Sequence, residues 1–299
     1  MSAVPVPDDR YRDLGRLLVV CPDRPGIVAA VTRFLHQHSA NITESQQYST
    51  DPFGGTFFLR IQFYLADLAG VVDRLREGFA AVAGGFGMRW RLSQAGTVKR
   101  VALFASRADH ALQEILWRNR AGDLHAEIGM VISNHPDLYP VAAAWGVPYH
   151  HIPVSRQTRV EAERAQLDLL RGNGERGDTD LIVLARYMQI LSPAFLAQYP
   201  NRIINIHHGF LPAFVGANPY QGAHDRGVKL IGATAHYATE ELDAGPIIEQ
   251  DVARVDHRHD VAQLRRIGRQ VERDVLYRAV SWHLEDRVLV HGNKTIVFA

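Results

Sequence analysis

Three polar side chains in the C-terminal half of the chain follow or separate apolar runs. Asn205 and His207 come directly after an apolar run that ends at Ile204, and Asp243 lies in the turn 242–246. An amide can donate a hydrogen bond to an oxygen that becomes negative. An imidazole can hold or move a proton near neutral pH, and a carboxylate can orient water or an imidazolium. With no serine or cysteine placed beside them as a nucleophile, this set suits attack of water on a carbonyl carbon.

Each motif also has a structural interpretation. An Asn-x-His at a strand end commonly hydrogen-bonds within its own loop, and an Asp-x-Gly-Pro commonly forms a turn. Here both motifs occur together, with a glycine-containing loop between them. We therefore predict that Asn205, His207 and Asp243 are catalytic.

The elements around these residues favour one edge of a sheet. The run up to Ile204 is typical of a buried strand, and 229–237 alternates like a second strand that carries His236. In open α/β sheets ligands bind outside the carboxyl ends of the strands. The amide, the imidazole and the carboxylate are thus expected at successive strand ends.

The motif set resembles a known family. Asn-Ile-His at 205–207, Leu211-Pro212 and Leu-Asp-Ala-Gly-Pro-Ile at 242–247 resemble the formyltransferase family that handles 10-formyltetrahydrofolate. The run from 207 to 220 is more similar to formyltetrahydrofolate deformylases than to glycinamide ribonucleotide transformylases. The resemblance covers nearly the whole chain. It implies hydrolysis of 10-formyltetrahydrofolate to tetrahydrofolate and formate, which would supply formate for purine biosynthesis and balance one-carbon folate pools.

The resemblance also implies where the folate binds. Main-chain atoms near Gln189, Ile190 and Leu191 would contact the pterin ring, and the expected folate-binding set is Met188, Gln189, Ile190, Leu191, His236 and Gly245. The folate is the substrate, so no cofactor is expected. No metal is expected either, because the run 256–260 (Asp-His-Arg-His-Asp) lacks cysteine and helical spacing. Gly209 departs from the deformylase pattern, in which a serine beside His207 is usual.

Residues 12–95 have the order strand, helix, strand, strand, helix, strand, which is the ferredoxin-like arrangement. The turn Asp-Arg-Pro-Gly at 23–26 and the Asn-Ile pair at 41–42 resemble an ACT domain, a small regulatory module. The resemblance implies an amino-acid effector, with glycine or methionine as candidates, or pairing of subunits into a homodimer or homotetramer. The candidate effector site is Asp23, Arg24, Gly26, Ile27, Asn41 and Ile42.

Residues 98–299 alternate strands and helices, which predicts a doubly wound, mostly parallel α/β domain of the formyltransferase type. The first strand-to-helix turn, 106–110, contains no glycine and has an acidic residue. It is a poor phosphate cradle, which favours hydrolysis over transfer to a phosphorylated acceptor.

Composition limits the partners. The chain has 299 residues and a formal net charge of +1, so nothing indicates a nucleic-acid or membrane partner. Its single cysteine, Cys21, suits a reducing cytoplasmic setting, and the N-terminus has no signal-peptide pattern. Two alternatives remain: a formyltransferase with an amine or nucleotide acceptor, and a non-catalytic, amino-acid-responsive folate-binding regulator.

Overall fold

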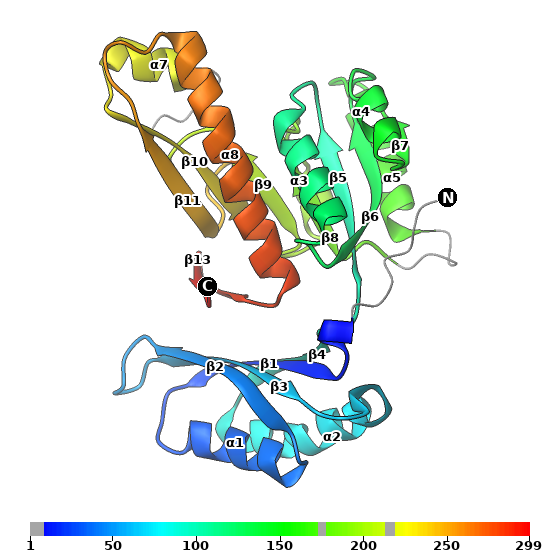
Figure 1. Cartoon of the computed structure of the whole chain (residues 1–299), viewed down its shortest axis with the longest axis vertical. Coiled ribbons are helices and arrows are strands. Elements are labelled where there is room, and N and C mark those ends of the chain that lie inside the picture. The colour runs from blue at the N-terminus through cyan, green and yellow to red at the C-terminus, as the bar shows by residue number, and fades with distance from the viewer. Residues whose placement is uncertain (1–8, 173–177, 213–218) are drawn as a thin grey trace. The chain divides into compact units, whose positions relative to one another are not determined.

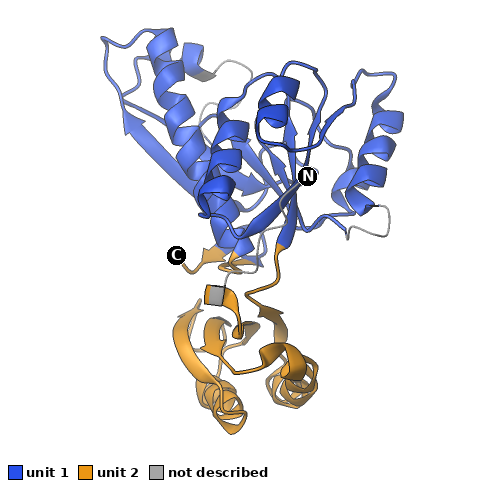
Figure 2. Ribbon diagram, turned by 45° about the vertical axis from the view of Figure 1, so that its right-hand side comes forward, with its two compact units in different colours: residues 1–4, 99–284, 290–295 blue, residues 5–98, 285–289, 296–299 orange. Residues whose placement is uncertain are grey.

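The computed structural model describes residues 9–172, 178–212 and 219–299, and these form two compact units (Figure 2). One unit contains the described residues of Lys99–Leu284 together with Val290–Thr295. The other contains the described residues before Lys99 together with Glu285–Leu289 and Ile296–Ala299. The N-terminal unit is called the first unit below. The sequence analysis assigned all of 98–299 to the second domain, whereas Glu285–Leu289 and Ile296–Ala299 group with the first unit.

The first unit is a four-stranded antiparallel sheet with two helices, which confirms the ferredoxin-like prediction (Figure 1). The strand order is β2-β3-β1-β4. A short 3-10 helix precedes the sheet, and the bounds are η1 (Asp9–Tyr11), β1 (Leu14–Pro22), α1 (Ile27–Gln37), β2 (Asn41–Ser49), β3 (Thr56–Tyr64), α2 (Leu68–Phe86) and β4 (Arg89–Gln94).

The two faces of this sheet have different partners. Leu17 and Val19 of β1 join the core with residues of α1 and α2 such as Phe34 and Phe79. Val20 points to the opposite face because successive strand residues alternate, and it packs there with Phe58 and Phe298. On the same unit the fully buried Arg60 donates to the main-chain carbonyl of Asp286. The C-terminal residues therefore cover part of the face that the helices leave open.

The second unit contains a seven-stranded sheet of order β11-β10-β9-β8-β5-β6-β7. Strands β5 to β9 pair in parallel, and β10 and β11 add antiparallel strands at one edge. This is the mostly parallel, doubly wound sheet that the βα repeats predicted. The strands are β5 (Lys99–Ala105), β6 (Ala126–Ser133), β7 (Tyr149–His151), β8 (Leu181–Leu184), β9 (Ile203–His207), β10 (Leu230–Tyr237) and β11 (Ile247–Arg254), with the hairpin β12 (Val288–His291) and β13 (Lys294–Val297) at the end of the chain.

Helices cover both faces of the larger sheet. On one face, Phe104 of β5 and Leu184 of β8 pack with Leu170 and Phe195, which belong to α5 and α6. On the other face α8 runs along β9, β10 and β11, and it lies beside α3 (Figure 1). The helices are α3 (His110–Ala121), α4 (Tyr139–Ala144), α5 (Arg159–Arg171), α6 (Pro193–Leu196), α7 (Pro219–Arg226) and α8 (Val261–Leu284).

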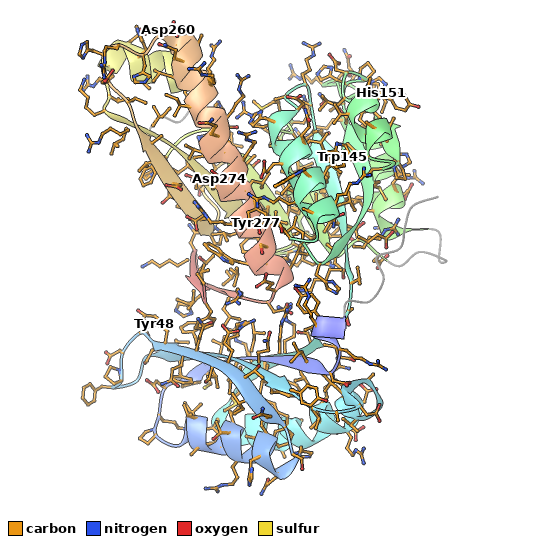
Figure 3. All side chains as sticks on the ribbon, in the orientation of Figure 1. Tyr48, Trp145, His151, Asp260, Asp274 and Tyr277 are labelled. Carbon is orange, nitrogen blue, oxygen red and sulfur yellow. The ribbon has the colours of Figure 1, made fainter. Side chains whose placement is uncertain are left out.

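The long helix α8 buries one face and exposes the other. Leu264, Val275 and Ala279 lie on its buried stripe, and Asp274 and Tyr277, which also belong to α8, are labelled in Figure 3. The Tyr277 ring lies 4.2 Å from the guanidinium carbon of Arg118 in a cation–π contact. Among the described residues, no helix combines the length and the apolar character that a bilayer span requires.

Candidate active site

The polar side chains of the site come from paired strands. Asn205 and His207 belong to β9, which pairs antiparallel with β10 so that Asn205 faces His236. Asp243 follows β10 in a turn where its φ is 56°, a left-handed conformation that aspartate tolerates better than most residues. The structure therefore brings together the three residues that the sequence predicted, and His236 lies with them.

His207 and Asp243 form an ion pair. His207 Nδ1 lies 3.2 Å from Asp243 Oδ2, and both side chains are largely buried, at 6% and 14% exposed. Hydrogen bonds from His207 and from His236 hold the pKa of Asp243 well below its usual range. The carboxylate is thus ionised at neutral pH, and its contact with Nδ1 fixes the orientation of the His207 ring.

The other ring nitrogen of His207 is available to a ligand. Its Nε2 is buried and has no hydrogen-bond partner among the residues that the structure describes. Buried polar atoms usually have a partner because an unmade hydrogen bond is costly. An atom in this state beside a cavity is a good contact point for a substrate oxygen.

His236 connects the amide to the carboxylate. Its Nδ1 lies 3.0 Å from the main-chain carbonyl of Tyr237, and since a carbonyl only accepts, Nδ1 carries a proton. Its Nε2 lies 3.2 Å from Asn205 Nδ2 and 3.5 Å from Asp243 Oδ1. Nε2 donates to Asp243 when it is protonated and accepts from Asn205 when it is not, and in both states at least one N–H of that amide remains for the substrate.

A cavity of about 330 Å³ opens on this group. The predicted folate-binding segment forms one side of it, and the predicted catalytic residues form the other. The residues lining it include Met188, Gln189, Ile190, Leu191, Asn205, His207, His236 and Asp243. Its volume lies in the range typical of small-molecule sites.

Two main-chain groups of the predicted folate-binding segment have partners within the protein. The Met188 N–H donates to Ser106 Oγ at 3.0 Å, and the Ile190 carbonyl accepts from Arg159 Nη2 at 2.5 Å. The side chains of Met188 and Ile190 are each 58% exposed. These two apolar side chains offer a surface against which a flat ring can pack.

Gly245 does not line the cavity, although the sequence analysis predicted it as a folate contact. A Cβ atom at this position would lie 1.9 Å from the main-chain oxygen of Tyr237. The glycine therefore allows the turn that carries Asp243 to approach β10 closely. Gly245 therefore positions the turn and does not line the cavity.

The loop after His208 is fixed by two residues that the sequence analysis missed. Thr234 Oγ1 donates to the Gly209 carbonyl at 2.9 Å and accepts from the Leu211 N–H at 3.0 Å. Gln250 Nε2 lies 2.9 Å from both the Leu211 carbonyl and Thr234 Oγ1. Neither residue interrupts the alternation of side chains along its strand, so the sequence gives no signal for it. Their contacts with the loop become visible only once the strands are paired in the structure.

In the first unit the predicted effector residues separate into two groups. Asp23 is hydrogen-bonded to Ser49, and Arg24 is bonded to the Gly85 carbonyl and lies over the Phe86 ring. Gly26 has a φ of 95° and is the N-cap of α1. Ile27 is the first residue of this helix and is buried. By contrast, Asn41 and Ile42 line a shallow groove with Thr32, Arg33 and His36. The structure thus brings the 41–42 pair to an open groove that the 23–27 turn does not line.

Comparisons with known proteins identify the family of each unit. The formyl transferase family model matches residues 99–280, and the ACT domain model matches residues 15–76. A formyltetrahydrofolate deformylase of Bacillus subtilis (strain 168) is 56% identical over 294 residues, which cover 97% of each chain. The chain belongs to the formyltetrahydrofolate deformylase family. The family resemblance and the two-domain fold that the sequence predicted are thereby confirmed.

Solved structures separate the deformylases from their transformylase relatives. A formyltetrahydrofolate deformylase from Pseudomonas syringae pv. tomato matches with a TM-score of 0.88 and 49% identity, and the match covers 96% of this chain and 94% of that one. Glycinamide ribonucleotide transformylase 1 from Symbiobacterium toebii matches with a TM-score of 0.62 and 31% identity, over 68% of this chain and 95% of that one. Of these two matches, the one with the deformylase extends over nearly the full length of the chain.

Proposed function

We propose that this member of the deformylase family hydrolyses 10-formyltetrahydrofolate to tetrahydrofolate and formate. The observation that carries the proposal is the His207–Asp243 pair, 3.2 Å apart, with the buried Nε2 of His207 left for a substrate oxygen. Asn205 lies on the same strand as His207, and one N–H of its amide is free to donate to the same substrate oxygen. Family membership supplies the substrate class.

In this mechanism the folate ring packs on Met188 and Ile190, which places the formyl carbon beside His207. Asp243 accepts a hydrogen bond from the attacking water, and His207 assists the transfer of a proton from that water. The oxygen of water bonds to the formyl carbon, and the carbonyl oxygen becomes an oxyanion that Asn205 and protonated His207 stabilise. The bond from carbon to N10 then breaks, N10 takes one proton, and formic acid loses the other to solvent.

The test is release of formate from purified protein and 10-formyltetrahydrofolate, with no amine or nucleotide added. Stoichiometric tetrahydrofolate and formate are expected. Turnover that requires an added acceptor would favour the formyltransferase alternative. Folate binding without any turnover would favour the regulatory alternative.

We also propose that the ACT unit binds an amino-acid effector, with glycine and methionine as candidates, and pairs subunits into a homodimer or homotetramer. The groove at Thr32, Arg33, His36, Asn41 and Ile42 supports the effector proposal, because it offers both a cationic and an amide side chain to a carboxylate. A soluble folate substrate and the buried single thiol of Cys21 fit a cytoplasmic location. Formate release with and without each amino acid, together with the molar mass in solution, tests these points.

A further inference from the structure

Glu272 is a buried carboxylate that the mechanism above does not use. It lies within α8 and is 2% exposed. Its Oε2 lies 2.9 Å from His110 Nε2 and 3.5 Å from Arg186 Nε, and its Oε1 accepts a hydrogen bond of 2.9 Å from Tyr220 Oη. These four residues, here named the Glu272 cluster, join α3, the loop after β8, α7 and α8.

The cluster is ionic. Burial by itself would raise the pKa of Glu272, but the hydrogen bond from His110 and the charge of Arg186 outweigh it and lower that pKa. Burial and the neighbouring Glu272 raise the pKa of Tyr220, so its phenol stays a donor. Buried ion pairs are seldom better for stability than apolar residues of the same volume. The position of the cluster in the fold is therefore more informative than its contribution to stability.

The cluster lies at the switch point of the sheet. The chain proceeds from β5 outward through β6 and β7, and then returns to place β8 on the other side of β5. Ligands of doubly wound sheets bind in the crevice at this point, outside the strand ends. His110 follows β5 and Arg186 follows β8. Glu272 joins the two side chains across the place where that rule puts a ligand.

The backbone at two positions accommodates the cluster. Arg186 has φ of 63°, a left-handed conformation that is unfavourable for a residue with a side chain. Gly268 lies one turn before Glu272 on α8, and a Cβ there would lie 1.9 Å from Tyr220 Oη. Tyr220 reaches Glu272 only because position 268 has no side chain.

The cluster also adjoins the proposed active site. Arg186 and His208 both line the cavity that contains His207 and Asp243. The His208 ring lies 6.1 Å from the Tyr220 ring and 5.3 Å from the His207 ring. Burial and the charge of Arg186 lower the pKa of His208 to about 4, so its ring is neutral at pH 7. This side of the cavity is thus a wall of interlinked side chains.

We propose that the Glu272 cluster fills the half of the site in which an amine acceptor would bind, and so reserves the formyl group for water. This inference rests on the proposed hydrolysis. Transfer to an amine would form a new C–N bond to the formyl carbon, break the bond to N10 and deliver one amine proton to N10. The chemistry matches hydrolysis except for the nucleophile, so the space beside the formyl carbon decides between the two. The transformylase relative of S. toebii shares this fold. The fold alone therefore does not determine whether water or an amine accepts the formyl group.

The experiment measures how the formyl group partitions between water and an added amine. Wild type and four variants are incubated with saturating 10-formyltetrahydrofolate and glycinamide, a small primary amine, and both formate and N-formylglycinamide are quantified. Glu272→Ala and His110→Ala open space, whereas Glu272→Gln and His110→Gln keep the volume and serve as matched controls. Circular dichroism checks that each variant is folded, and a sample without protein corrects for spontaneous transfer.

Wild type and both Gln variants are expected to give formate only. Each folded Ala variant is expected to form N-formylglycinamide at a rate at least tenfold above the background of the sample without protein. A folded Ala variant with the wild-type ratio of N-formylglycinamide to formate would overturn the inference, as would a wild type that already formylates glycinamide. If wild type releases no formate at all, the proposed hydrolysis itself fails, and the two failures are therefore distinguishable. Since the wild-type measurement alone can refute the inference, it stays testable even if an Ala variant does not fold.

Discussion

Nδ1 of His207 lies 3.2 Å from Oδ2 of Asp243, and this contact joins the end of β9 to the turn that follows β10. The low pKa of the carboxyl group keeps it negative at neutral pH. A negative partner fixes the orientation of an imidazole. In the proposed mechanism the opposite nitrogen, Nε2, contacts the developing oxyanion.

Replacing Asp243 by asparagine keeps the shape and removes the charge. We expect Asp243→Asn to lower kcat for formate release by about 10²- to 10⁴-fold, the usual range for a lost acid–base partner. KM should change much less, because the folate ring binds to other residues. Steady-state kinetics check this, with Asp73→Asn as control because that carboxylate is exposed on α2. A kcat within threefold of wild type would refute the role of Asp243.

Asn205 is expected to act only when the oxyanion forms. Asn205→Ala should lower kcat by about 10²- to 10³-fold, as the loss of one oxyanion donor commonly does. Asn205→Asp should be more damaging than Asn205→Ala, since it places a negative charge beside the oxyanion. The same kinetic assay ranks the two variants. Equal activity of the two would show that Asn205 does not face the developing charge.

That the predicted catalytic residues lie together could be foreseen because their motifs end strands. Asn205, His207 and Asp243 each follow or flank an apolar run, and the ends of neighbouring strands meet in space. Gly245 shows the limit of the same reasoning. Its motif position indicated a substrate contact, whereas the structure shows that the missing side chain lets the turn approach Tyr237.

The Glu272 cluster could not be predicted in the same way, because its members come from four elements far apart in the sequence. One local signal was present. Leu264, Gly268, Glu272 and Val275 have helical spacing, so a carboxylate interrupts the apolar stripe of α8 one turn after a glycine. A charged residue on a buried stripe indicates a buried partner, but its identity depends on tertiary contacts.

The place of the last residues was likewise hidden from the sequence. Residues 285–289 and 296–299 follow the second domain directly, yet they belong to the first unit. In the sequence Arg60 is a charged residue within an apolar strand. Its partners Asp286 and Glu44 lie 226 and 16 residues away along the chain. Only the folded chain shows why this arginine is fully buried.

Gly245 provides a stability test. A methyl group there would collide with main-chain atoms that cannot rotate away, so Gly245→Ala should destabilise the protein by about 1–3 kcal/mol. Gly84→Ala is the control, because a Cβ at this helical position has nothing within 4 Å. The control should be neutral or should stabilise the protein by up to about 1 kcal/mol. Urea unfolding measures both, and equal effects would contradict the close approach.

Glu272 should make stability depend on pH. Its folded-state pKa is lowered below 4.5, so the folded state binds fewer protons than the unfolded state in this range. The stability it contributes is therefore fully present above pH 4.5 and is lost as the pH falls through the folded-state pKa. Glu272→Gln should cost about 1–3 kcal/mol at pH 7, and this difference from wild type should shrink below pH 4.5.

Urea unfolding from pH 7.5 down to about 3.5 measures this difference, since the window extends from neutrality to below the ordinary glutamate pKa. Glu77→Gln is the control, because Glu77 is exposed on α2. Its difference from wild type should be small and constant. A Glu272→Gln difference that does not vary with pH would show that Glu272 contributes by packing and not by its charge.

The hairpin β12–β13 holds the turn that carries Asp243. Asn293 Nδ2 donates to the Ala244 carbonyl at 2.8 Å, and Thr295 Oγ1 donates to the Ile247 carbonyl at 2.6 Å. Each hydrogen bond contributes about 0.5–1.5 kcal/mol, and small misplacements of catalytic groups are costly. The double variant Asn293→Ala/Thr295→Val should therefore lower kcat about tenfold with little change in KM.

Two comparisons show whether this effect passes through Asp243. Lys294→Ala lies between the two donors on the same hairpin and is exposed, so it should leave kcat close to wild type. In an Asp243→Asn background the hairpin substitutions should have almost no further effect on kcat, because residues that act as one unit are not additive. A tenfold loss that persists in that background would mean that the hairpin acts on another part of the site. The hydrogen bonds to residues 244 and 247 would then stabilise the turn without positioning its carboxylate.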